Sequence, residues 1–117
     1  MFEDRDTFKA FLKNSNKEVT IIKFTAKWCG PCKKIAPTVK NLLEKYKHSN
    51  FRYYELDVDE CFDTYAFFKK KRMVTGIPAF CVYYKSKYDE DTFYVPTKIV
   101  TGANAEAITH MFHEALK

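Results

Sequence analysis

Hydrophobic and polar residues follow two different spacings along this chain, and the order of these patterns predicts an α/β fold. Apolar residues recur at helical spacing in residues 8–12 and 33–47 and again after residue 104, which predicts amphipathic helices. Runs of β-branched and aromatic residues at 19–26, 51–59, 78–85 and 98–101 are typical of strands. A further helix is expected over residues 60–70 with Asp59 as its N-cap, and Asn104 is suited to cap the last helix.

The order of these elements also predicts how the strands pair. The first two strands flank a helix, and such a unit is almost always parallel and right-handed. The last two strands are joined by a loop, which predicts antiparallel pairing. We therefore expect one domain over residues 1–117, with a central four-stranded mixed sheet and helices on both faces. Residues 1–3 leave room only for a very short fifth strand, and Pro37 predicts a kink within residues 33–47.

Composition narrows the classes of protein to which the chain can belong. Hydrophobic residues make up 46% and charged residues 30% of the 117 residues, a balance typical of soluble globular domains. No apolar run approaches the ~20 residues of a membrane span, so no membrane partner is expected. Residues 1–6 are polar and lack the apolar core of a signal peptide. We therefore expect a cytoplasmic protein in a reducing compartment.

The net charge of +5 comes mostly from lysine. This charge either steers acidic partners towards the protein or belongs to an ordinary solvated surface. The basic run at residues 69–72 is short, and the chain has few arginines, although arginine is the commonest reader of bases. No nucleic-acid partner is expected.

The most informative motif is Trp28-Cys29-Gly30-Pro31-Cys32, which directly follows an expected strand. A helix that begins at or just after Cys29 presents unpaired backbone N–H groups and the positive end of its dipole to that sulfur. The thiolate, which is the nucleophile, is stabilised there. Cys32 lies about one turn later and can attack a mixed disulfide at Cys29. Two thiols at this spacing beside a βαβ pattern indicate redox chemistry.

Four segments resemble the thioredoxin family, and they occur in the same order. Residues 24–33 are similar to its active-site segment, and residues 56–59 to the strand after the active-site helix. Residues 76–78 resemble the loop whose proline is cis and faces the disulfide, and residues 101–104 resemble the entry to the last helix. The resemblance implies a thioredoxin-like fold and a thiol–disulfide oxidoreductase that reduces protein disulfides. The Gly-Pro pair between the cysteines resembles reductants rather than the histidine-containing isomerase type.

The same resemblance implies roles for individual residues. Cys29 attacks the target disulfide and Cys32 resolves the mixed disulfide. The residues expected to bind substrate around the disulfide are Trp28, Gly30, Pro31, Ile77, Pro78 and Gly102. The implied partners are disulfide-containing proteins and a thioredoxin reductase or an equivalent reductant. We expect a monomer that has no metal and no cofactor beyond the Cys29–Cys32 disulfide.

Lys23 departs from the family pattern. It lies six residues before Cys29, where the family usually has a buried aspartate that assists proton transfer at the second cysteine. The usual lysine partner of that aspartate matches Glu55, so the two charges are exchanged. We expect Lys23 and Glu55 to take catalytic roles as a pair, because an isolated buried charge is very costly. The alternative is that Lys23 reaches the surface with its alkyl stem packed on the sheet.

Two further questions are left open by the sequence. The fold can also serve as a binding module, which docks a partner through Trp28, Pro78 and the basic run without turnover. The connection at residues 86–97 is long for a hairpin and rich in aromatic residues. It either binds a ligand or covers the edge of the chain's own sheet.

The remaining cysteines and histidines give weaker signals. Cys61 is either a regulatory thiol or a small residue at a helix start, whereas Cys81 is expected in the core. His110 and His113 lie three residues apart on the last helix. That helix is distant from the paired cysteines in this fold, so no zinc site is expected.

Overall fold

The computed structural model describes residues 4–116 and contains a mixed β-sheet with the strand order β2-β1-β3-β4. Strand β1 (Val19–Thr25) pairs in parallel with β2 (Phe51–Asp57) and antiparallel with β3 (Ala79–Tyr84). Strand β4 (Lys98–Thr101) adds antiparallel to β3. The predicted four-stranded mixed sheet is therefore confirmed. The short fifth strand considered for residues 1–3 lies outside the described residues.

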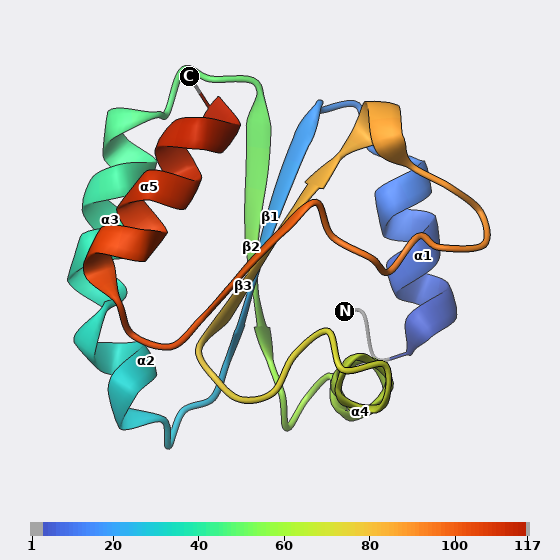
Figure 1. The fold of residues 1–117 in the computed structure, drawn as a ribbon, viewed down its shortest axis with the longest axis horizontal. Helices are drawn as coiled ribbons and strands as arrows, with labels where there is room; N and C mark the ends of the chain where they lie inside the picture. Colours follow the sequence, from blue (N-terminus) through green and yellow to red (C-terminus); the bar gives the residue numbers. More distant parts are fainter. Residues whose placement is uncertain (1–3, 117) are drawn as a thin grey trace.

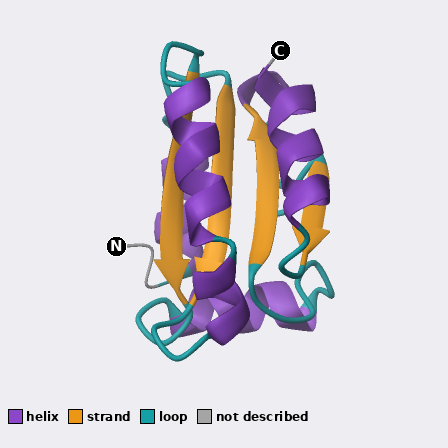
Figure 2. Ribbon diagram, turned by 90° about the vertical axis from the view of Figure 1, so that its left-hand side faces the viewer, coloured by secondary structure: helices purple, strands orange, loops and turns teal. Residues whose placement is uncertain are grey.

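Helices cover both faces of this sheet. Figure 1 shows α3 (Ala36–Lys45) and α5 (Ala105–Leu116) on one side, and α1 (Arg5–Lys13) and α4 (Phe62–Lys70) on the other. The short helix α2 (Gly30–Lys34) connects β1 to α3 at one end of the sheet. In Figure 2, α3 and α5 run side by side in front of the strands. The result is a three-layer α/β arrangement.

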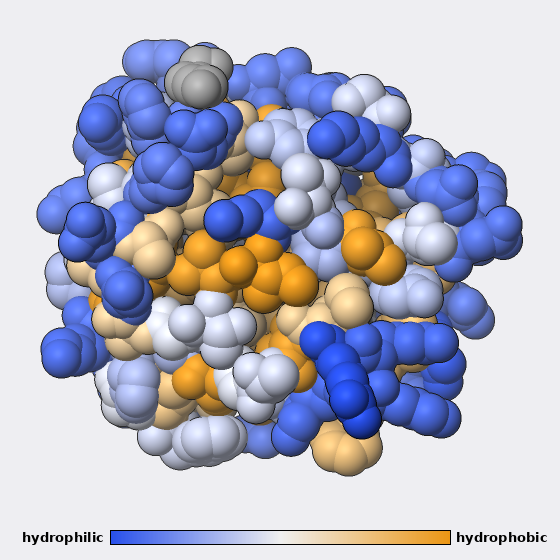
Figure 3. Space-filling view, in the orientation of Figure 1, coloured by the Kyte–Doolittle hydropathy of each residue, from blue (hydrophilic) through white to orange (hydrophobic). Residues whose placement is uncertain are grey.

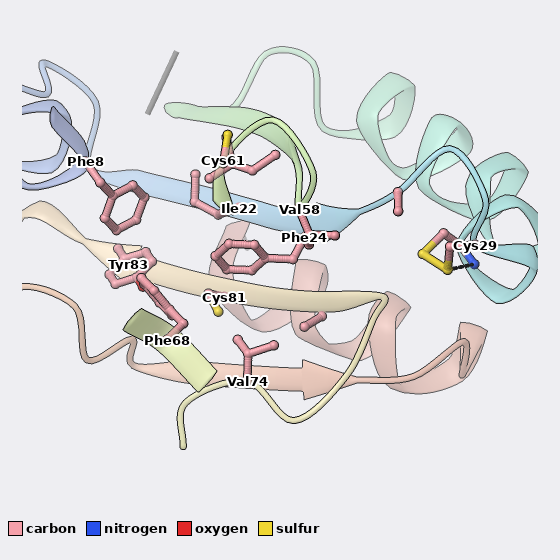
Figure 4. Packing of buried hydrophobic residues seen from close by; sticks show 14 of the residues in the cluster. Phe8, Ile22, Phe24, Cys29, Val58, Cys61, Phe68, Val74, Cys81 and Tyr83 are labelled. Carbon is pink, nitrogen blue, oxygen red and sulfur yellow. Dashed lines mark hydrogen bonds between the residues drawn. A yellow bond between two sulfur atoms is a disulfide. The ribbon is translucent and has the colours of Figure 1, made fainter. Parts of the chain in front are cut away.

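Alternating side chains of the strands divide the core into two halves. Ile22 and Phe24 belong to the half under α1 and α4, where Phe24 packs against Phe68 with ring centroids 5.1 Å apart (Figure 4). Ile21 and Phe80 belong to the other half, with side chains of α3 and α5. All five side chains are fully buried. Each stabilises the fold by about 1.5–3 kcal/mol relative to an exposed position.

Strand β4 forms one edge of the sheet. In the orientation of Figure 1, Figure 3 shows hydrophobic side chains across the middle of the molecule, around β4, bordered by hydrophilic ones. The strand is only four residues long, and its end residues Lys98 and Thr101 are exposed. A short edge strand with polar ends limits pairing with another chain.

The helix predicted over residues 33–47 is in fact two helices. It divides at Ile35, which ends α2 and precedes α3, and α3 stops at Lys45. Pro37 occupies the second position of α3. A backbone N–H has no partner within the helix at that position, so the missing donor costs little. Pro37 therefore helps to begin a helix rather than kinking one.

The start of α4 also differs from the prediction. The helix begins at Phe62 rather than at residue 60, and its N-cap residue is Cys61, which makes no side-chain capping bond. Asp59 is therefore not the N-cap. It lies in a turn in which Asp57 Oδ1 accepts the Asp59 N–H at 2.8 Å, an alternative that aspartate offers to a helix start.

The other element ends lie close to the predictions. Strands β1 and β2 stop one and two residues before the expected ends at 26 and 59, and β3 is one residue shorter at each end. A 3-10 turn, η1 (Lys85–Lys87), follows β3. Asn104 caps α5 as predicted, because its Oδ1 accepts the Ala107 N–H at 3.0 Å.

The connection between β3 and β4 packs on the chain's own helices. Phe93 stacks on Phe67 of α4 with ring centroids 6.3 Å apart. The Glu90 carboxylate lies 3.0 Å and 2.9 Å from the ammonium groups of Lys9 and Lys13 in α1. Figure 1 shows that this segment extends away from the sheet and passes beside α1. The connection thus covers α1 and α4, whereas the sequence had suggested the edge of the sheet or a ligand.

Arg72 directly follows Lys71, the C-cap residue of α4, and has a backbone conformation that favours glycine. Its φ is +60°. The Arg72 N–H donates to the Lys69 carbonyl and the Met73 N–H donates to the Phe68 carbonyl, which is the Schellman arrangement. A left-handed conformation costs a residue other than glycine roughly 1–2 kcal/mol.

We expect Arg72→Gly to raise the free energy of unfolding by about 0.5–1 kcal/mol, since the relief of strain exceeds the added freedom of the unfolded chain. Urea denaturation measures the change. Lys71→Gly is the matched control, because the φ of Lys71 is −83°, and this variant should be destabilised. A less stable Arg72→Gly protein would contradict the prediction.

Candidate active site

The paired cysteines lie just after the end of β1. A turn brings the Cys29 N–H to the carbonyl of Ala26 at 3.1 Å. Cys29 is the N-cap residue of α2, with φ −83° and ψ 105°. Pro31 lies in the first turn, where its missing N–H costs nothing. The motif therefore begins a helix at its first cysteine, as the sequence predicts.

Cys29 and Cys32 form a disulfide across the first turn of α2, with Cα atoms 5.3 Å apart. The Cys32 N–H donates to Cys29 Sγ at 3.1 Å, the dashed line in Figure 4. The two residues are only 3% and 2% exposed. Once the pair is reduced, the same N–H and the positive end of α2 face the Cys29 sulfur, and both stabilise its thiolate.

Trp28 is fixed beside the disulfide by the segment that follows β2. The Val58 N–H donates to the Thr25 carbonyl at 2.9 Å, so the two strand ends stay side by side. The indole N–H of Trp28 donates to Asp59 Oδ2, also at 2.9 Å. Even so, 66% of Trp28 is exposed. The ring is thus held in place and still presents an apolar surface next to the cysteines.

The Ile77–Pro78 peptide bond is cis, as the family resemblance implied. Pro78 is buried and directly precedes β3, and its carbonyl accepts the Gly102 N–H at 2.8 Å. Gly102 has a φ of +101°, which glycine adopts without strain. Gly30 and Pro31 are exposed in the first turn of α2. In Figure 1 the loops that carry these residues all lie at the same end of the sheet.

Lys23 and Glu55 are brought together by the pairing of β1 with β2. The parallel register places them opposite each other, with Lys23 Nζ 3.7 Å from Glu55 Oε2. The Lys23 side chain is 3% exposed and that of Glu55 is 47% exposed. The Lys23 ammonium therefore stays inside the protein. The alternative, in which Lys23 reaches the surface with its stem packed on the sheet, does not describe this structure. Glu55 connects this buried charge with solvent.

Tyr53 is a third member of this group, and the sequence did not single it out. Its hydroxyl donates to Glu55 Oε2 at 2.6 Å. Burial, assisted by this bond and by the charge of Glu55, raises the pKa of Tyr53. Its position two residues before Glu55, on the same face of β2, was the available signal. Lys23, Glu55 and Cys32 line one hollow, so the group lies on the Cys32 side of the disulfide.

Comparisons with known proteins agree with this geometry. The Thioredoxin family model matches residues 1–111. The thioredoxin of Equus caballus is 37% identical over 83 residues, which cover 62% of this chain and 77% of that protein. The chain belongs to the thioredoxin family.

Solved thioredoxin structures share the fold. Oxidised mitochondrial thioredoxin 3 of Saccharomyces cerevisiae has a TM-score of 0.69 at 28% identity, covering 93% of this chain and 88% of that chain. The reduced thioredoxin pre-protein of Schistosoma mansoni has a TM-score of 0.70 at 26% identity, covering 97% and 92%. The predicted thioredoxin-like fold is confirmed.

Family membership defines the chemistry of the cysteine pair. Thioredoxins are thiol–disulfide oxidoreductases that act through a redox-active disulfide without a cofactor. This member of the family is therefore a protein-disulfide oxidoreductase, and Cys29 and Cys32 are its redox-active pair.

The other two cysteines of the chain, Cys61 and Cys81, form no disulfide and are buried. Burial raises the pKa of the Cys81 thiol to about 12, so it is protonated and unreactive at neutral pH. His113 Nδ1 lies 3.2 Å from the Tyr46 hydroxyl. Across residues 4–116, no three His, Cys, Asp or Glu side chains are grouped to hold a metal ion. No helix in that part of the chain has the length and apolarity needed to cross a membrane.

The raised pKa of Cys81 should make the stability of this protein fall at high pH. Its value of about 12 in the folded chain compares with an ordinary 9.0. The unfolded chain loses this proton first, so the contribution is complete below pH 9.0 and is lost as the pH rises towards about 12.

We expect Cys81→Ala to flatten the pH dependence of the unfolding free energy by up to about 1.4 kcal/mol per pH unit in that range. Urea denaturation with a reductant present, at several pH values, gives both slopes. The pKa of buried Tyr83 is raised first by burial and further by Cys81, so only the larger, burial part of its contribution is common to both proteins. Identical slopes would show that Cys81 is not the group responsible.

Proposed function

We propose that this chain reduces protein disulfides, with Cys29 as the attacking thiol and Cys32 as the resolving thiol. The observation that carries the assignment is the hydrogen bond from the Cys32 N–H to Cys29 Sγ at the start of α2. It supports Cys29 as the nucleophile, because a backbone donor and the positive helix end favour a thiolate at that sulfur.

Reduction of a target takes two exchanges. The Cys29 thiolate attacks one sulfur of the target disulfide, the target S–S bond breaks, and the other target sulfur leaves as a thiolate and takes up a proton. Cys32 then loses its proton and attacks Cys29 Sγ. The mixed disulfide breaks, the second target sulfur leaves, and the Cys29–Cys32 disulfide forms. Two electrons pass to the target, which is reduced, while this chain is oxidised.

The surface beside the disulfide is assigned to substrate binding. It comprises the residues around the cysteines at this end of the sheet, namely Trp28, Gly30, Pro31, Ile77, Pro78 and Gly102. The exposure of Trp28 and the hydrogen bond between Pro78 and Gly102 support this assignment. An exposed apolar ring and an adjoining ordered loop suit the docking of an extended polypeptide.

The oxidised chain needs an external reductant before it can act again. The proposed partners are disulfide-containing proteins and a thioredoxin reductase or equivalent, and family membership supports both. We assign a monomeric state and a cytoplasmic location to the chain. A chain in which Cys61 and Cys81 are outside any disulfide suits a reducing compartment.

Cys29→Ser is expected to abolish disulfide reduction, and Cys32→Ser is expected to accumulate mixed disulfides, because only Cys32 can release the target from Cys29. Insulin reduction with a thioredoxin reductase measures turnover, and mass spectrometry without reductant detects the trapped species. Normal turnover by Cys32→Ser would reverse the assignment. A binding module, in contrast, would keep its function with both cysteines changed to serine.

Lys23 and Glu55 are assigned to the resolving step. They share a hollow with Cys32, so a buried positive charge lies on the side where Cys32 must lose its proton. Such a charge favours a thiolate. The half-exposed Glu55 can accept a proton and pass it to water. This role uses the exchanged charges together, since Lys23 alone would be a costly buried ion.

The pair predicts coupled effects on stability. Glu55→Gln leaves the Lys23 ammonium buried without a carboxylate and should lower the free energy of unfolding by about 1–3 kcal/mol. Lys23→Met should cost less, because Glu55 can hydrate. The double variant should recover part of the loss, with a coupling of at least about 0.5 kcal/mol by urea denaturation.

The catalytic part of this prediction has a separate readout. Rapid mixing should show that Glu55→Gln slows the resolving step more than the first attack. Additive stabilities, or equal slowing of both steps, would leave Lys23 and Glu55 without a role in resolution.

A further inference from the structure

Tyr53 donates a hydrogen bond to the carboxylate that pairs with Lys23. The Tyr53 hydroxyl lies 2.6 Å from Glu55 Oε2. The same oxygen lies 3.7 Å from Lys23 Nζ, which exceeds the length of an ordinary hydrogen bond. The Tyr53 hydroxyl is therefore the closer restraint on the Glu55 carboxylate, and the ion pair with Lys23 is the looser one.

A carboxylate as exposed as that of Glu55 needs such a restraint. Its side chain is 47% exposed and belongs to β2, which forms an edge of the sheet. A long charged side chain loses rotamer entropy when it is held against a partner, and a solvent-exposed ion pair recovers little of that loss. Without the Tyr53 hydroxyl, the carboxylate can turn into water and away from the buried ammonium of Lys23.

The ring of Tyr53 is itself held by the core. Tyr53 lies opposite Ile21 in the register of β1 and β2, on the face of the sheet that α3 and α5 cover (Figure 1). Its ring packs against that of Phe112 in α5, with the centroids 6.3 Å apart. Burial, together with the bond to Glu55 and the charge of Glu55, raises the pKa of Tyr53. A fixed ring thus presents a protonated hydroxyl to Glu55 throughout the neutral pH range.

We propose that Tyr53 is a positioning residue for the resolving step, because its hydroxyl keeps the Glu55 carboxylate beside Lys23. This inference rests on the proposed role of Glu55, which shares a hollow with Cys32, and names the residue that holds it in place. In the resolving step the Cys32 proton passes to Glu55, directly or through water. The Cys32 sulfur bonds to Cys29 Sγ, and the target sulfur leaves with the electrons of the mixed-disulfide bond. Tyr53 acts through Glu55 alone, so the first attack by Cys29 should not depend on it.

The test compares pre-reduced wild type with Tyr53→Phe, Glu55→Gln, the double variant and the control Tyr54→Phe in rapid-mixing reactions. The probe is a limiting amount of bis(nitrobenzoate) disulfide, because the first attack and the resolving step each release a coloured thiolate from it. We expect Tyr53→Phe to slow the second release about three- to tenfold, the loss expected for a single hydrogen bond, and the first release by less than about twofold.

Two comparisons distinguish positioning from a general structural effect. In the Glu55→Gln background, Tyr53→Phe should slow the second release no further, because the two residues act as a unit. Tyr54→Phe removes a hydroxyl from the opposite face of the same strand, and both releases should match those of wild type.

Each outcome separates this inference from the proposed function. If wild type releases no coloured thiolate, the proposed disulfide reduction fails. If Glu55→Gln resolves as fast as wild type, the role of Glu55 fails, and the role of Tyr53 fails with it. Tyr53 is not a positioning residue if Glu55→Gln resolves slowly but Tyr53→Phe resolves normally. The same conclusion holds if Tyr53→Phe slows both releases equally or adds its effect to that of Glu55→Gln, and in these cases the proposed disulfide reduction stands.

Discussion

The register of β1 against β2 is the constraint on which the active site depends. It places Lys23 opposite Glu55 and ends the two strands side by side, so the loops that follow them leave the sheet together. Only then can the indole of Trp28 reach Asp59 across 31 positions of sequence. A slip of one residue would turn one strand's side chains to the opposite core, and the lysine would lose its partner.

The same register makes a lysine tolerable in a central strand. Lys23 is the one charged residue among the buried side chains within residues 4–116. Its ammonium has the Glu55 carboxylate at 3.7 Å on one side and the ring of Phe80 at 6.0 Å on another. The Glu55 carboxylate is half-exposed to water and also accepts a hydrogen bond from the Tyr53 hydroxyl. The protein therefore neutralises the ammonium without burying two ions completely. A surface lysine could not hold its charge in the hollow that Cys32 lines.

Features that depend on side-chain periodicity or on neighbours a few residues away could be predicted from the sequence. These include the parallel pairing of the first two strands, the antiparallel pairing of the last two, the capping role of Asn104 and the helix start at Cys29. The start of α4 could not be predicted, because the Asp59 carboxylate is bound by Trp28 from another strand end. The packing of the 86–97 connection likewise depends on Phe67, which is distant in sequence. Tyr53 was missed because its importance follows from Glu55, whose surroundings only the folded sheet defines.

The division between scaffold and site explains where specificity can reside. Two clusters of buried hydrophobic residues pack on the sheet, and changes there cost stability. The residues to which substrate binding is assigned lie on loops and a first helical turn at one end of the sheet, where the backbone is fixed by a few hydrogen bonds. In the first turn of α4, the buried Cys61 and Thr64 hold the helix in place. Exposed residues on these loops can therefore change in chemistry with little effect on the buried clusters, so surface preference and fold stability can be adjusted separately.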